Sequence, residues 1–197
     1  MARPPREVVA GGVYHVVARG NRGSGIFRDD TDFAAYLKLL DGARKRFGWN
    51  VLAHCLMRNH VHLLIETPDP NLPSGIQWLH GKYGRRFNDR HDLFGHLFQG
   101  RYKAIRQKTD PQLWQALRYI ALNPVEAGVS GCPREYRWSS YGATLRGNPG
   151  PVAVHRVSWF LGADEDQQGL DRYRRLVEDA PSVKRARQDS NLRPSVP

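Results

Sequence analysis

The chain has 197 residues, 40% of them hydrophobic and 25% charged, which is enough to bury a sizeable core and is ordinary for a soluble globular protein. Its 30 Lys and Arg against 19 Asp and Glu give a formal net charge of +11, which predicts a polyanionic partner, nucleic acid before an anionic membrane. No apolar run approaches the roughly 20 residues of a membrane span, and the two cysteines, Cys55 and Cys132, have no metal-type spacing. We therefore expect a cytoplasmic protein with reduced cysteines and no membrane partner.

The first predicted elements are a strand, a loop, a helix and a second strand. Residues 13–19 are rich in β-branched side chains and lie between glycines, which is typical of a strand. The basic loop over 20–28 has no nucleotide-binding glycine pattern, so it either contacts a phosphate backbone or simply connects two elements. A helix over 30–47, ended by Gly48, and a strand over 49–55 follow.

Two histidines lie on the same side of the third predicted strand. Over residues 57–66, MRNHVHLLIE, apolar side chains alternate with His60 and His62. Successive side chains on a strand point to opposite faces, so the two imidazoles leave the backbone together while Val61 and Leu63 face a core. Two neutral imidazoles with a third ligand can hold a divalent metal and leave positions open for substrate. The alternative is a pair of hydrogen-bonded strand histidines.

A helix over 74–88 and a basic strand from Arg101 complete a recognisable order of elements. The order β-α-β-β-α-β predicts an α+β fold, the ferredoxin-like split βαβ sandwich, with an antiparallel sheet and the histidine pair on its open face. The basic run on the helix is either a DNA contact or a solvated face. The DNA-binding candidates, chosen for charge and for an expected position beside the histidines, are Arg19, Arg22, Lys82, Arg85, Arg86, Arg101 and Lys103.

An additional helix, over residues 110–123, is predicted to lie on the open face of the sheet. Asn123-Pro124 closes it, because the residue before a proline resists helical geometry. Tyr119 and Asn123 are four residues apart and are therefore neighbours on the helix surface. A phenol and an amide oxygen presented together suit a nucleophile and a metal ligand. Alternatively, Tyr119 is a half-buried packing residue and Asn123 is a C-terminal cap.

The remaining chain predicts smaller elements and a tail. A loop leads into a short capped helix near residue 140, and residues 164–179 form a polar helix. The segment from 181 onward is basic, polar and punctuated by proline, so we expect it to be disordered. We divide the chain into a main domain over 1–145, a C-terminal helical extension over 146–180 and a tail over 181–197.

Three motifs occur in a characteristic order: HVH at 60–62, GHLFQGRYK at 95–103 and RYIALNPVEAG at 118–128. Together they resemble the single-tyrosine HUH transposases of the insertion-sequence type, and more closely the REP-associated tyrosine transposase branch. The segments 12–30 and 138–141 (WSSY) fit the same pattern, so the resemblance extends over most of the predicted main domain.

The resemblance implies that His60 and His62 bind a catalytic Mg²⁺ or Mn²⁺, that Asn123 is a third ligand and that Tyr119 is the nucleophile. The implied enzyme is a DNA transposase that cleaves and rejoins single-stranded DNA, at hairpins or palindromic repeats, through a 5′-phosphotyrosine intermediate. A mixed nitrogen and oxygen site suits Mn²⁺ better than Mg²⁺. A tyrosine is a poor nucleophile at its usual pKa of about 10, and His96 is a candidate to assist it.

Two other functions are compatible with the same residues. One is a domesticated regulator that binds hairpin DNA without turnover, and the other is a metal-dependent hydrolytic nuclease in which water attacks and Tyr119 only packs. The intact set of His60, His62, Tyr119 and Asn123 favours the transposase, since pure binding needs none of these residues. A monomer and a homodimer are both compatible, and in a homodimer the tyrosine helix can serve its own subunit or its partner.

Overall fold

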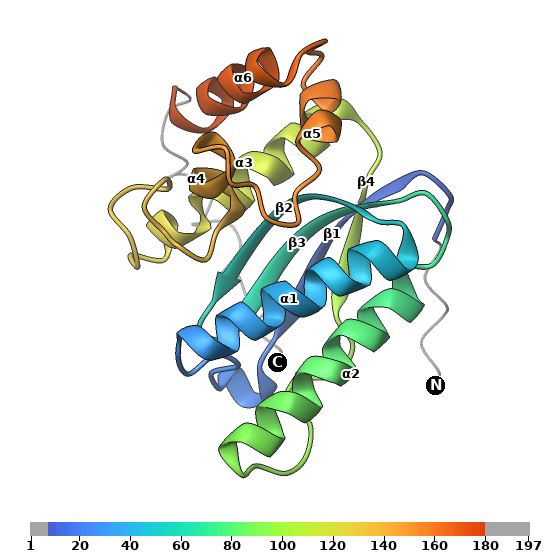
Figure 1. Ribbon diagram of the computed structural model, residues 1–197, viewed down its shortest axis with the longest axis vertical. Helices are drawn as coiled ribbons and strands as arrows, with labels where there is room; N and C mark the ends of the chain where they lie inside the picture. Colours follow the sequence, from blue (N-terminus) through green and yellow to red (C-terminus); the bar gives the residue numbers. More distant parts are fainter. Residues whose placement is uncertain (1–7, 180–197) are drawn as a thin grey trace, which may run out of the picture.

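The structure, a computed structural model, describes residues 8–179 and contains a single sheet with helices on both faces (Figure 1). In chain order the elements are β1 (Gly12–Arg19), the short 3-10 helix η1 (Asn21–Gly23), α1 (Asp30–Phe47), β2 (Asn50–Met57), β3 (His60–Thr67), α2 (Leu72–His91), β4 (Lys103–Gln107), α3 (Asp110–Glu126), α4 (Ser140–Leu145), α5 (Val154–Phe160) and α6 (Asp166–Glu178). The predicted tail at 181–197 lies outside the described residues.

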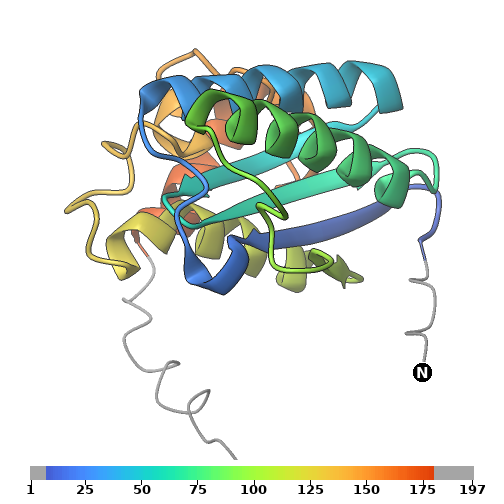
Figure 2. The same cartoon turned by 90° about the horizontal axis from the view of Figure 1, so that it is seen from below.

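The sheet has the strand order β2-β3-β1-β4, and every neighbouring pair is antiparallel. With α1 between β1 and β2, and α2 between β3 and β4, this is the split βαβ arrangement of a ferredoxin-like sandwich. Figure 2 shows α1 and α2 together on one face of the sheet and α3 on the other. The predicted α+β fold is confirmed, including the additional helix on the second face.

A hydrophobic layer fills the space between the sheet and the helices α1 and α2. Val16 of β1 lies opposite Leu63 of β3, and both side chains are fully buried. The two helices contribute Tyr36 and Tyr83, whose rings pack edge to face with centroids 5.0 Å apart. Burying side chains of this size contributes about 1.5–3 kcal/mol each. This layer therefore stabilises the sheet, whose opposite face carries the histidine pair.

The helix α3 crosses that other face, where it contacts β2, β3, β4 and also α6. The prediction that it ends at Asn123 is wrong, because it continues through Pro124 to Glu126. A proline removes only one backbone N–H, and the N–H of Ala127 still donates to the Asn123 carbonyl at 3.0 Å. Asn123 thus lies inside the helix and is not a C-terminal cap.

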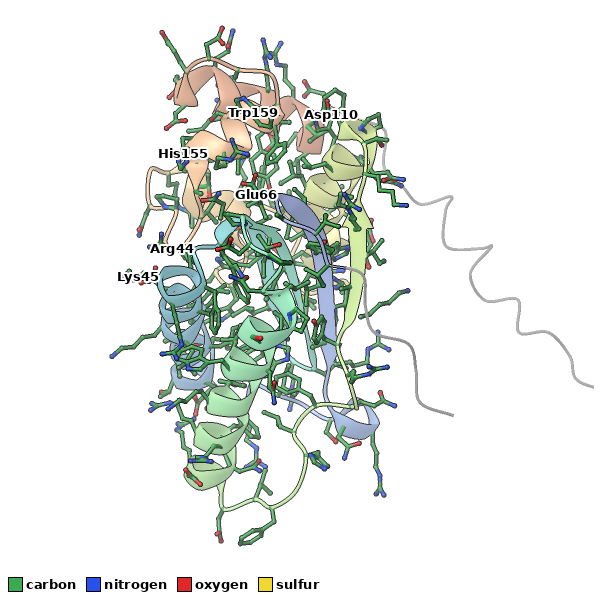
Figure 3. The ribbon with its side chains drawn as sticks, turned by 90° about the vertical axis from the view of Figure 1, so that its right-hand side faces the viewer. Arg44, Lys45, Glu66, Asp110, His155 and Trp159 are labelled. Atoms are coloured by element: carbon green, nitrogen blue, oxygen red, sulfur yellow. The ribbon has the colours of Figure 1, made fainter. Side chains whose placement is uncertain are left out.

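Two C-terminal helices pack onto this arrangement: α5 contacts β2 and α6, and α6 contacts α3 and α4. Figure 3 shows Glu66, at the end of β3, close to the helix that carries His155 and Trp159. Arg156 of the same helix donates two hydrogen bonds to the Glu66 carboxylate, at 2.9 and 2.5 Å. The pattern of the sequence predicts no helix at α5, and the proposed domain boundary near residue 146 stays a prediction. Among the described helices, none has both the length and the apolar character that crossing a membrane requires.

Candidate active site

The strand register brings three histidines to the face that α3 covers. Arg19 of β1 lies opposite His60, and Val17 lies opposite His62. Directly opposed residues of antiparallel strands point to the same face, as do residues two apart along one strand. His15 of β1 therefore shares the face with the predicted pair and is the diagonal neighbour of His62.

The helix α3 adds the phenol and the amide predicted from its flank. The Tyr119 ring lies 5.4 Å from the His62 ring and 5.8 Å from the His15 ring, between centroids. Tyr119 is 37% exposed, so its ring is packed on one side and open on the other, whereas Asn123 is only 4% exposed. All of these side chains line a cavity of about 560 Å³ between α3 and the sheet, together with Arg19 and Lys103.

Each predicted metal-binding histidine has its Nδ1 atom engaged. His60 Nδ1 lies 2.7 Å from Asn59 Oδ1, and His62 Nδ1 lies 3.0 Å from His15 Nε2. Since an amide oxygen only accepts, His60 carries its proton on Nδ1 and keeps the lone pair on Nε2. This is the form in which an imidazole binds a metal through Nε2.

Burial keeps these imidazoles neutral. It lowers the pKa of His60, with the positive charge of Arg19 adding to the effect and Asn123 opposing it. Burial also holds the pKa of His62 well below its usual range, helped by the neighbouring His15, His60 and Arg19. A metal ligand must be unprotonated, so the site favours the ligand form at neutral pH.

The third predicted ligand is an unsatisfied buried atom. Asn123 lies beside His60, yet its Oδ1 is buried and accepts no hydrogen bond of normal geometry from any of residues 8–179. Buried amide oxygens are nearly always paired, and an exception calls for an explanation. No three His, Cys, Asp or Glu side chains in this part of the chain are grouped to hold a metal, and the Asn123 amide lines the same cavity as the two predicted histidine ligands. Two imidazoles and an amide oxygen fit Mn²⁺ or Mg²⁺ bound with open positions.

The basic DNA-binding candidates lie in four places. Arg19 and Lys103 line the cavity with Tyr119, and Arg22 is exposed in η1 just after β1. Lys82 and Arg86 are exposed on α2, in the helical layer on the far side of the sheet (Figure 2). The expectation that these two side chains lie beside the histidine pair is wrong. It was based on their charge, and the sequence does not show on which face of the sheet the helix packs.

The last two basic candidates line a second groove. This groove, of about 860 Å³, lies between α2 and residues 95–102 and contains Arg85, Arg101 and His96. The loop is held there by backbone pairing with the end of β1, where Gln99 N–H donates to the Arg19 carbonyl at 2.8 Å. His96 therefore lies in a different cavity from Tyr119, and its predicted assistance to the tyrosine is not supported by its position.

His15 is the site residue that sequence reasoning missed. Its meeting with His62 depends on the register of β1 on β3, which the sequence does not reveal. Arg118 also lines the cavity and was not selected. Arg118 directly precedes Tyr119, and this position in a basic chain could have indicated a contact with DNA.

A known protein family matches most of the main domain. The family model for IS200-like transposases matches residues 8–123, and this family defines a class of DNA-processing enzymes. The chain belongs to the IS200-like transposase family, as its motifs predicted. No curated protein sequence matches it significantly.

Two solved structures are similar to the chain. A REP-associated tyrosine transposase bound to a REP hairpin has a TM-score of 0.63 and 18% identity, over 75% of this chain and 87% of that one. A putative transposase from Deinococcus radiodurans has a TM-score of 0.42 and 23% identity, over 60% of this chain and 95% of that one. The first shares the fold described here.

Proposed function

We propose that the chain is a metal-dependent transposase of the REP-associated branch, which cleaves and rejoins single-stranded DNA through a covalent bond to Tyr119. The observation that carries this proposal is the meeting of Tyr119 with His60 and His62 in one cavity, from two elements that are distant in sequence. The family match supports the class of enzyme, and the shared cavity supports the choice of residues.

The residues proposed to hold the metal are His60 and His62, each through Nε2, and Asn123 through Oδ1. When bound, Mg²⁺ or Mn²⁺ supplies a Lewis acid that polarises the scissile phosphate. The mixed donor set favours Mn²⁺. Arg19 and Lys103 line the same cavity and add positive charge where the phosphate would lie.

In the proposed step, Tyr119 Oη attacks phosphorus and a tyrosine–phosphate bond forms. The bond from phosphorus to the 3′ oxygen breaks, the phenol loses its proton, and the leaving oxygen gains one to become a free 3′-hydroxyl. The number of phosphoester bonds is unchanged, so a 3′-hydroxyl from another strand can reverse the step and join new ends. The exposed side of Tyr119 is compatible with access by a DNA strand.

The groove beside α2 is proposed as a path for unpaired nucleotides. Phe98 stacks on His80 with ring centroids 4.2 Å apart, and Tyr102 lies alongside in the same groove. Aromatic faces stack on bases while Arg85 and Arg101 can pair with phosphates. Lys103, which lines the tyrosine cavity, follows Tyr102 of this groove directly along the chain.

The proposed substrate is a single-stranded DNA hairpin of the kind formed by palindromic repeats. The similar solved transposase is bound to a REP hairpin, and this chain has the same fold. The strongly basic character of this chain is also suited to DNA. Lys82 and Arg86, on the outer face of α2, are proposed as further phosphate contacts for a bulky hairpin.

A cleavage assay with labelled hairpin oligonucleotides tests the proposal. The full chain and Mn²⁺ are mixed with DNA labelled at either the 3′ or the 5′ end, and the products are separated on a denaturing gel. A transposase of this type attaches the 3′-labelled fragment to the protein and releases the 5′-labelled fragment. Cleavage without a labelled protein band would favour a hydrolytic nuclease, and binding without cleavage would favour a regulator.

A further inference from the structure

His15 reaches from β1 to the neighbouring strand and forms a hydrogen bond with a proposed metal ligand. Its Nε2 atom lies 3.0 Å from Nδ1 of His62, and the two ring centroids are 5.2 Å apart. Both side chains are buried, so water competes little for this bond. The pairing of Val17 with His62 fixes the two histidines as diagonal neighbours.

If His62 binds a metal through Nε2, this hydrogen bond can run in only one direction. A neutral imidazole carries one N–H, so His62 can present a lone pair at Nε2 only when its proton is on Nδ1. Nδ1–H then donates to His15 Nε2, and His15 must carry its own proton on Nδ1. Asn59 acts on His60 in the same way, since its Oδ1 accepts from His60 Nδ1 at 2.7 Å. The two proposed ligands therefore have matching partners.

We propose that His15 is a positioning residue, which accepts a hydrogen bond from His62 and thereby fixes the tautomer and ring orientation that direct His62 Nε2 toward the metal. The inference rests on the metal site given under Proposed function. Partners of this kind orient ligating histidines and raise their basicity, and their loss usually lowers metal affinity by about 10–100-fold.

His15 also contacts the proposed nucleophile. Its ring lies 5.8 Å from the Tyr119 ring, and the Tyr119 ring lies 5.4 Å from that of His62, so the three rings pack as a triangle. All three side chains line the same cavity, together with Lys103.

Two substitutions separate hydrogen bonding from packing. His15→Phe keeps a ring of similar size but has no accepting atom, whereas His15→Gln places an amide oxygen near the position of Nε2. Mn²⁺ alone is titrated into the full chain without DNA, with the free ion followed by electron paramagnetic resonance. We expect His15→Phe to weaken Mn²⁺ binding by about 10–100-fold and His15→Gln by less than about threefold. Thermal unfolding of both variants checks that the fold is retained.

A second measurement needs no metal and no variant. Long-range ¹H–¹⁵N correlation spectra of the histidine rings at pH 7.5 report which nitrogen of each ring carries the proton. The inference predicts the Nδ1–H tautomer for both His62 and His15 in the wild-type protein. The Nε2–H tautomer at His62 would overturn it, even if His15→Phe fails to fold.

The outcomes distinguish this inference from the proposed function. If wild type and His15→Phe bind Mn²⁺ equally, the positioning role is wrong and the metal site stands. If His15→Gln is as weak as His15→Phe, the accepting atom is not what matters, and the role is again wrong. If the wild-type protein binds no Mn²⁺, the metal site is wrong and the inference falls with it.

Discussion

The ring of Tyr119 lies edge-on to the ring of His62, with centroids 5.4 Å apart and planes inclined at 81°. One residue comes from α3 and the other from β3, and the core on both faces of the sheet fixes their relative position. A proposed nucleophile and a proposed metal ligand held this close by rigid elements need little reorganisation before reaction. The arrangement is therefore suited to chemistry on a bound phosphate.

Tyr119→Phe should abolish cleavage and leave hairpin binding unchanged. The substitution removes only the attacking oxygen, and the ring still packs against His15 and His62. Loss of a nucleophile lowers turnover by at least about a thousandfold in comparable cases. Cleavage is measured on a denaturing gel and binding by fluorescence anisotropy. Cleavage at the wild-type rate would exclude Tyr119 as the nucleophile.

Asn123→Leu should lower Mn²⁺ affinity without destabilising the protein. The Asn123 amide oxygen is buried and accepts no hydrogen bond of normal geometry from the described residues, and such an atom costs about 1–3 kcal/mol. A leucine of similar size removes that cost, so the free energy of unfolding should stay the same or rise. Denaturant titration of the metal-free protein measures this, with Mn²⁺ titration in parallel. Destabilisation together with unchanged Mn²⁺ affinity would show that the amide is structural.

Arg85→Ala and Arg101→Ala should each weaken hairpin binding, because both side chains line the groove beside α2. Losing one phosphate contact lowers the slope of log affinity against log salt by about 1. The affinity of each variant is measured at several salt concentrations. Arg174→Ala is the matched control, since Arg174 is exposed on α6 and pairs with Asp171. A control that weakens binding as much as the groove variants would show a general charge effect.

The stability of the protein should fall as the pH is lowered from about 6.5 to about 4. Burial lowers the pKa of His54 to about 4 and of His80 to about 3, so the unfolded chain binds protons in this range that the folded chain does not. The contribution of these two histidines to the free energy of unfolding is therefore fully present above pH 6.5. It is lost as the pH falls toward their folded pKa values, at up to about 1.4 kcal/mol per pH unit for each histidine.

His80→Gln isolates one of these two contributions. Glutamine does not titrate, and it can keep a polar partner for Tyr36, whose hydroxyl lies 3.1 Å from His80 Nε2. Thermal unfolding across the pH range should show a shallower slope for His80→Gln than for wild type. Equal slopes would mean that His80 does not titrate on unfolding.

The sequence predicted the strands and helices whose apolar residues recur at the spacing of a strand or a helix. Alternation along β3 correctly put His60 and His62 on one face, and the helical spacing of Tyr119 and Asn123 correctly put them on one flank of α3. Both patterns are local, because the geometry of a single strand or helix decides them.

The features that the sequence did not predict depend on contacts between distant segments. The hydrogen bond between His15 and His62 depends on the register of β1 on β3. The position of His96 depends on the backbone pairing of residues 95–102 with Arg19. The short helix α5 is tied to the sheet through Arg156 and Glu66, and a helix of this length is marginal alone. None of these contacts leaves a periodic signal in the sequence.

The most direct test of the central claim is to identify the covalently modified residue. The full chain is incubated with hairpin DNA and Mn²⁺, digested with nuclease and trypsin, and analysed by mass spectrometry. The tryptic peptide over residues 119–134 contains a single tyrosine, Tyr119, so a nucleotide adduct on it assigns the site without ambiguity. The account predicts that adduct, and predicts its loss with a chelator. An adduct on another residue, or DNA cleaved with every tyrosine unmodified, would contradict it.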